Sequence, residues 1–143
     1  MAARVINLPQ AMQNQVVGNK TLTDAGGVAQ CIDQMQGFST QDALVASTTQ
    51  SQAGGTVITG SLSRTNSVVN GSDAFTLGFQ AIPGRSFTFI NDGGNTCNLF
   101  PFKGDKINDA VKDAAVGIAD NTCSDYYCPI VGLWFGGATT LET

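Results

Sequence analysis

Short segments in which apolar and polar residues alternate follow one another through the second half of the chain. They are residues 56–62, 66–70, 74–79, 85–90, 97–100, 126–130 and 133–135. A period of two is typical of strands, and turn signals such as Asn91-Asp-Gly-Gly-Asn95 separate them. Strands at a spacing of about 8–12 residues predict an all-β fold, built as a β-sandwich, a jelly roll or a small barrel.

Helical patterns are few. Residues 105–118 have apolar positions at helical spacing, but they can equally form a loop through Asp113 followed by a strand over residues 114–118. Residues 8–16 and 39–46 are candidates for a helical turn, so we expect at most one or two short ones. No solenoid repeat is evident in the sequence.

Aromatic and amide residues are distributed unevenly. Ten of the eleven aromatic residues lie at Phe75 or later, whereas nine of the ten glutamines lie at or before Gln52. Because aromatic side chains bury the largest area per residue, we expect the main core in residues 56–136. The amide-rich start predicts an extended N-terminal arm over residues 1–20, followed by a single β domain over residues 21–143.

Composition narrows the possible functions. The 143 residues carry a formal net charge of −4, only 13% are charged, and there is no histidine. An average soluble domain has about 25% charged residues. Without histidine, Ser-His-Asp catalysis and imidazole metal sites are excluded. The mild acidity argues against a nucleic-acid partner, and no apolar run approaches the roughly 20 residues of a membrane helix.

The four cysteines, Cys31, Cys97, Cys123 and Cys128, allow three interpretations. Buried free thiols are favoured, since cysteine is among the most buried residue types. A disulfide between Cys123 and Cys128 is possible if Ser124–Tyr127 form a hairpin loop. A zinc site would need two close pairs, and only one pair is close.

Two further clusters could carry chemistry. Asp105, Asp109 and Asp113, with Asp92 nearby, could bind Ca²⁺ or perform glycoside hydrolysis. Interleaved lysines favour a solvated loop instead. Tyr126, Tyr127, Trp134 and Phe135 could stack on a sugar, but a role in the core or at a subunit interface is favoured. We therefore predict no catalytic residues, no cofactor, no metal and no small-molecule substrate.

The order of motifs in residues 74–136 resembles a β module found in virion proteins of tailed bacteriophages. The residues that carry it are Gly84-Arg-Ser-Phe-Thr-Phe-Ile-Asn91, Asn98-Leu-Phe-Pro101, Gly104-Asp105, Ile107-Asn108, Ala114-Ala-Val-Gly-Ile118 and Trp134. The segment from Cys123 to Cys128 departs from that pattern. The resemblance implies that residues 114–118 form a strand.

Members of this family are structural, so the resemblance implies scaffold roles rather than catalytic ones. The residues it implies for turns are Asn91, Gly94, Asn98, Pro101, Gly104, Asp105 and Asn108, and the core or interface aromatics are Phe87, Phe89, Phe100 and Trp134. Among virion proteins of this size it best suits a head decoration, or cement, protein. Such a protein sits on the outer capsid surface, often as a homotrimer, and binds the major capsid protein.

Two other functions remain open, a phage tail or fibre component and a carbohydrate-binding β module. For the decoration protein, we expect the arm to contact its partner through Val5, Ile6, Leu8 and Pro9, a short apolar anchor. Assembly would take place in the host cytoplasm.

Overall fold

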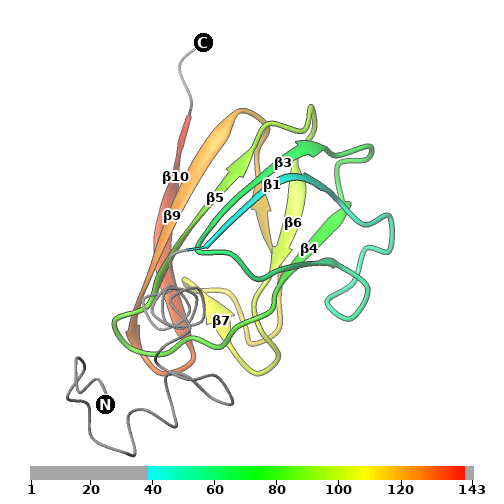
Figure 1. Ribbon diagram of the computed structural model, residues 1–143. Coiled ribbons are helices and arrows are strands. Elements are labelled where there is room, and N and C mark those ends of the chain that lie inside the picture. The colour runs from blue at the N-terminus through cyan, green and yellow to red at the C-terminus, as the bar shows by residue number, and fades with distance from the viewer. Residues whose placement is uncertain (1–38, 141–143) are drawn as a thin grey trace, which may run out of the picture. The chain divides into compact units, whose positions relative to one another are not determined.

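Ten strands make up the part of the chain that is described, residues 39–140 of a computed structural model (Figure 1). They are β1 (Thr40–Val45), β2 (Thr56–Ile58), β3 (Leu62–Ser67), β4 (Ala74–Leu77), β5 (Ser86–Asn91), β6 (Cys97–Phe100), β7 (Lys106–Ile107), β8 (Val116–Ile118), β9 (Thr122–Ile130) and β10 (Leu133–Thr140). Residues 39–140 contain no helix, and therefore none long and apolar enough to cross a membrane. The predicted all-β class is confirmed for this region.

The first six strands alternate between two sheets. Sheet A has the order β1-β3-β5-β9-β10-β7, and sheet B has the order β2-β4-β6-β8. Within each sheet the alternating strands stack in parallel, β1 on β3 on β5 and β2 on β4 on β6. A chain that passes from one sheet to the other and returns one step along forms the coils of a β-solenoid. Figure 1 shows β1, β3 and β5 side by side, with β4 and β6 in the neighbouring sheet.

The last strands end the coil with antiparallel pairs. β8 pairs antiparallel with β6, β9 with β5, and β10 with β9. β9 and β10 form a long hairpin at the far side of sheet A, and β7 adds a short parallel pairing to β10. The described region is therefore a short parallel coil closed by an antiparallel hairpin.

The core lies between the two sheets. Inward positions on β4, β5 and β10 are filled by large side chains that are fully or almost fully buried, among them Phe75, Phe87, Phe89 and Trp134. The rings of Phe75 in sheet B and Phe89 in sheet A have centroids 5.1 Å apart. Trp134 meets the ring of Phe87 edge-on at 4.8 Å. The expectation that the aromatic-rich half builds the core is confirmed.

The finer prediction of a sandwich, jelly roll or barrel is wrong, because those architectures do not stack alternate strands in parallel coils. The expectation of no solenoid repeat is also corrected. β1, β3 and β5 begin at residues 40, 62 and 86, so one coil takes 22 to 24 residues. The strand spacing read from the sequence is thus half of a coil, and alternation along a strand does not reveal whether its neighbour is parallel.

Three local predictions can also be compared with the structure. The strand over residues 114–118 is confirmed in its last part, β8. The helical turn over residues 39–46 is wrong, since these residues form β1. The segment 66–70 belongs to β3 only as far as Ser67. The predicted arm, residues 1–20, and the possible turn at 8–16 lie outside the described residues.

Candidate functional site

The candidate site is the group of turns and loops that carry the phage-like motifs. Val5, Ile6, Leu8 and Pro9, the predicted partner contacts, lie outside the described residues. The predicted turn residues all lie within them. Asn91 is the last residue of β5, and Gly94, Pro101, Gly104, Asp105 and Asn108 lie in the segments after β5, β6 and β7. Asn98 lies within β6, so it is a strand residue and not a turn residue.

Asn91 is the most deeply buried of the turn residues, with no exposed surface. Its Nδ2 donates to the carbonyl oxygens of Asn95 and Ile118, both at 2.9 Å, and its Oδ1 accepts from the Gly93 amide at 3.1 Å. Asn91 is the last residue of β5 in sheet A, and Ile118 is the last residue of β8 in sheet B. One amide side chain therefore fixes the β5–β6 turn and connects the two sheets.

Two neighbouring motif residues, Gly94 and Asn98, also form hydrogen bonds between backbone and side-chain groups. Gly94 has a φ of +87°, a conformation that favours glycine, and its amide donates to Asp120 Oδ1 at 2.8 Å. Asn98 Nδ2 donates to the Ser72 carbonyl oxygen at 3.3 Å. Both contacts join segments more than twenty residues apart in the sequence.

A second cluster holds the loop between β6 and β8. Gly104 has a φ of +94°, and its amide donates to Asp113 Oδ1 at 2.6 Å. Gln52 Nε2 donates both to Asp113 Oδ1 at 3.0 Å and to the Pro101 carbonyl oxygen at 2.9 Å. The hydrogen bond from Gly104, followed by that from Gln52, lowers the pKa of Asp113 below its ordinary value. Gln52 was not among the predicted site residues.

Asp105 and Asn108 connect this loop to the strands. Asp105 is 8% exposed, and its Oδ2 accepts from the Ala81 amide at 2.7 Å. Asn108 Nδ2 donates to the Gly136 carbonyl oxygen, and the Gly136 amide donates to Asn108 Oδ1, both at 3.0 Å. Asn108 thus pairs with β10 as a neighbouring strand would, just beyond the end of β7.

Gly136 shows why this position is glycine. A Cβ atom there would collide with the carbonyl oxygen of Asp125 on β9. The residue therefore allows the backbones of β9 and β10 to approach closely while its own amide and carbonyl are engaged by Asn108.

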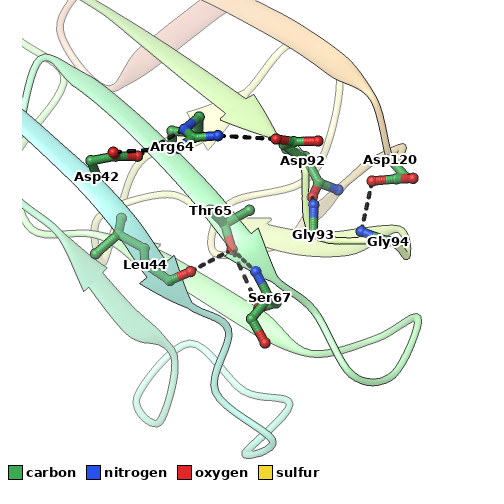
Figure 2. A network of polar contacts seen from close by, with 10 residues as sticks. Asp42, Leu44, Arg64, Thr65, Ser67, Asp92, Gly93, Gly94 and Asp120 are labelled. Atoms are coloured by element: carbon green, nitrogen blue, oxygen red, sulfur yellow. Dashed lines mark hydrogen bonds and ion pairs between the residues drawn. The ribbon is translucent and has the colours of Figure 1, made fainter.

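An ion-pair network crosses the parallel strands on the outer face of sheet A (Figure 2). No pattern in the sequence predicts it. Arg64 on β3 binds both carboxylate oxygens of Asp42 on β1, at 2.8 and 3.3 Å, and Asp92 after β5 at 3.0 Å. The hydrogen bond to Arg64 lowers the pKa of Asp42. These side chains are 41% to 66% exposed, so each ion pair contributes little to the free energy of folding. Together the pairs connect β1, β3 and the end of β5.

The aspartates considered for catalysis or Ca²⁺ do not converge on one point. Asp105 accepts a hydrogen bond from the Ala81 amide, and Asp113 accepts one from the Gly104 amide. Asp92 binds the guanidinium of Arg64. In residues 39–140 no group of three or more histidine, cysteine or acidic side chains is arranged to hold a metal ion. Asp105 and Asp113 therefore act as hydrogen-bond acceptors for backbone amides.

The cysteines of the described region are free thiols, namely Cys97, Cys123 and Cys128. The hypothesis of a hairpin loop between Cys123 and Cys128 is wrong, because Ser124–Tyr127 lie within β9. Five positions apart on one strand, the two side chains point to opposite faces. Burial raises the pKa of Cys97 to about 12. Cys31 lies outside the described residues.

The aromatic residues divide into two groups. Phe87, Phe89, Tyr126 and Trp134 are buried and Phe100 is half-buried, so Tyr126 and Trp134 cannot stack on a ligand from outside. Tyr127 and Phe135 are each 61% exposed. The alternation of β9 and β10 explains the division, since neighbouring residues on a strand face opposite sides of the sheet.

Comparison with known proteins adds no relative. No protein-family model, no curated protein and no solved structure matches the chain.

The reciprocal pair of Asn108 and Gly136 predicts a specific order of stabilities. Asn108→Ala removes both hydrogen bonds and places alanine at a φ of +51°, so we expect a loss of about 1–3 kcal/mol in the free energy of unfolding. Asn108→Gly removes the same bonds but tolerates this φ, so its loss is smaller. Urea denaturation of both variants measures the difference, and equal stability of wild type and Asn108→Ala would contradict the assignment.

Asp113 predicts an acid-dependent contribution to stability. Its pKa is lower in the folded state than the ordinary value of 3.8, so its contribution is present above about pH 4 and is lost as the pH falls through the folded pKa. We expect Asp113→Asn to be less stable than wild type at pH 7, with the difference shrinking toward pH 2 in urea titrations. Asp109→Asn, which removes an exposed carboxylate of the same loop, is the matched control. A difference between wild type and Asp113→Asn that does not change with pH would show that the carboxylate charge plays no part.

Proposed function

We propose that the chain is a capsid decoration protein of a tailed bacteriophage, which binds the outer surface of the head and stabilises contacts between major capsid protein subunits. Its partners would be the major capsid protein and further copies of itself, most simply as a homotrimer. It would assemble in the host cytoplasm and remain on the virion, without catalysis, cofactor, nucleic acid or membrane.

The observation that carries the proposal is the use of the phage-like motif residues in the fold. The side chains of Asn91, Asp105 and Asn108 bind backbone groups of other segments, and the Gly104 amide is bound by the side chain of Asp113. Residues with such contacts preserve an architecture rather than a reaction. A motif of this kind supports membership of a structural family, as the resemblance implies.

The scarcity of charge supports the same function. On the outer face of sheet A, Arg64 is paired with Asp42 and Asp92, and Asp125 accepts from Thr88. Other outward positions, such as Ser86 on β5 and Cys123 on β9, are uncharged. Neutral polar groups cost less to desolvate than charges when two protein surfaces meet. A decoration protein is contacted by partners on several sides, so a surface with few charges lowers the desolvation cost of these contacts.

A tail or fibre component is the second candidate, and the parallel coils favour it. Among the described residues, β1 pairs only with β3, and β2 only with β4. The first coil therefore ends in two edge strands, on which further strands of another chain could stack. Immunogold labelling of virions distinguishes the candidates, since a decoration protein labels the head and a fibre component labels the tail.

The proposed arm contact is tested by truncation. Deleting residues 1–10 removes Val5, Ile6, Leu8 and Pro9, and we expect lower occupancy on purified heads that lack the protein, because an apolar anchor is lost. Deleting only residues 1–4 keeps the anchor and is the control. Occupancy is measured from the ratio of bound protein to capsid protein in sedimented heads.

Two outcomes would count against this account. Full-length protein that does not bind heads at saturating concentration overturns the decoration function. Unchanged occupancy after deletion of residues 1–10 overturns the role of the anchor alone.

A further inference from the structure

Exposed apolar side chains gather at the end of the β9–β10 hairpin. This hairpin patch consists of Ile82, Tyr127, Pro129, Ile130, Val131 and Phe135. Val131 is 79% exposed, Tyr127 and Phe135 are each 61% exposed, Ile130 is 60% exposed and Ile82 is 49% exposed.

The strand register brings these residues together. Tyr127 and Phe135 are direct partners across the antiparallel pair of β9 and β10. Tyr126 and Cys128 point into the core, so Tyr127 and Pro129 share the outer face.

Two backbone hydrogen bonds hold the segment that contains Ile82 beside the hairpin. The Gly84 amide donates to the Cys128 carbonyl oxygen at 2.9 Å, and the Gly132 amide donates to that of Ala81 at 3.0 Å. The patch is therefore built by two separate segments of the chain, which these bonds fix against each other.

The patch itself contains no charged residue. Lys106 lies at its border, where it pairs with Leu133 of β10, and two further border charges, Arg85 and Asp125, are engaged. Arg85 donates to the Gln80 carbonyl oxygen at 3.2 Å and lies 5.5 Å from the centre of the Phe79 ring. Asp125 accepts a hydrogen bond of 2.6 Å from Thr88. A nucleic acid or an anionic membrane would require free cationic groups, which the patch lacks.

The size of the patch is that of an interaction surface. With these exposures, the side chains present on the order of 500 Å² of apolar surface, given the area of large side chains. The largest apolar patch of a typical monomer is about 300–600 Å² and is often functional. Two such patches in contact would bury about 1,000 Å², the size at which specific protein interfaces begin.

We propose that the hairpin patch binds the same patch of a second copy of this chain. Identical copies, each with a net charge of −4, repel one another, so an uncharged apolar surface is where they can approach at least cost. A contact between identical patches closes around a twofold axis and therefore gives a dimer. The proposal rests on the self-association in the proposed function and gives that association its surface, but it does not depend on capsid binding.

The test compares two valine substitutions by light scattering after size-exclusion chromatography. Val131→Asp places a charge in the patch. Val69→Asp makes the same change at a valine that is 65% exposed and lies in the segment between β3 and β4, outside the patch. We expect wild type and Val69→Asp to form a dimer of the 14.8 kDa chain, and Val131→Asp to need at least about a tenfold higher concentration to associate. Far-ultraviolet circular dichroism verifies that all three proteins are folded.

Several results would overturn the inference. They are a wild type that is monomeric at every concentration, an oligomer that Val131→Asp leaves intact, and equal dissociation of both variants. Tyr127→Lys, a second charge in the patch, must reproduce the effect of Val131→Asp.

Head binding is measured separately on the same proteins. A wild-type protein that associates through the patch but does not bind heads overturns the decoration function alone. A monomer that binds heads overturns only the inference drawn from the patch.

Discussion

Parallel coils require the chain to turn at the end of every strand, and each turn leaves backbone groups that can no longer pair within a sheet. At one end of sheet A, a row of buried polar side chains binds such groups and also the carbonyl of Leu44, where the register of β1 shifts. Thr65, Asn91 and Thr122 lie side by side on β3, β5 and β9. Thr65 Oγ1 donates to the Leu44 carbonyl oxygen and Thr122 Oγ1 to that of Ala119, both at 2.7 Å. Because an unpaired buried polar group costs about 1–3 kcal/mol, the coil depends on this row.

Asn91 joins the two sheets in this row, since its amide makes two hydrogen bonds within the β5–β6 turn and one to the end of β8. It also stands where the fold changes, because β5 pairs in parallel with β3 and antiparallel with β9. The loops beyond depend on similar contacts, with Asn108 pairing with Gly136 and Asp113 with Gly104. The proposed structural function fits a region whose turn residues bind its own backbone and whose hairpin patch is exposed.

Several elements could be predicted from the sequence. The alternating segments at residues 74–79, 85–90 and 97–100 contain β4, β5 and β6, because one buried face imposes a period of two. Gly94, Gly104 and Asn108 lie at turns with left-handed φ values, as their residue types predict, whereas Asn98 lies within β6.

The rest depends on contacts between segments distant in the sequence. The alternation along a single strand does not show whether its neighbour is parallel. The sequence pattern therefore predicts a sandwich or barrel, where the structure has a parallel coil. Arg64 meets Asp42 and Asp92 only through the register of β1, β3 and β5. Likewise, the pairing of Tyr127 with Phe135 requires the bulged hairpin register. The alternation of residues 126–130 and 133–135 predicts two strands, but it does not show that the outward residues Tyr127 and Phe135 are partners.

The most direct test of this account replaces the Asn91 amide by a carboxylate of the same shape. Asn91→Asp loses both donated hydrogen bonds and buries a charge, so urea denaturation at pH 7 should show a loss of at least about 3 kcal/mol in the free energy of unfolding. Asn66→Asp makes the same change at an exposed position of β3 and should stay within about 0.5 kcal/mol of wild type. Equal stability of the two variants would contradict the claim that the fold depends on Asn91.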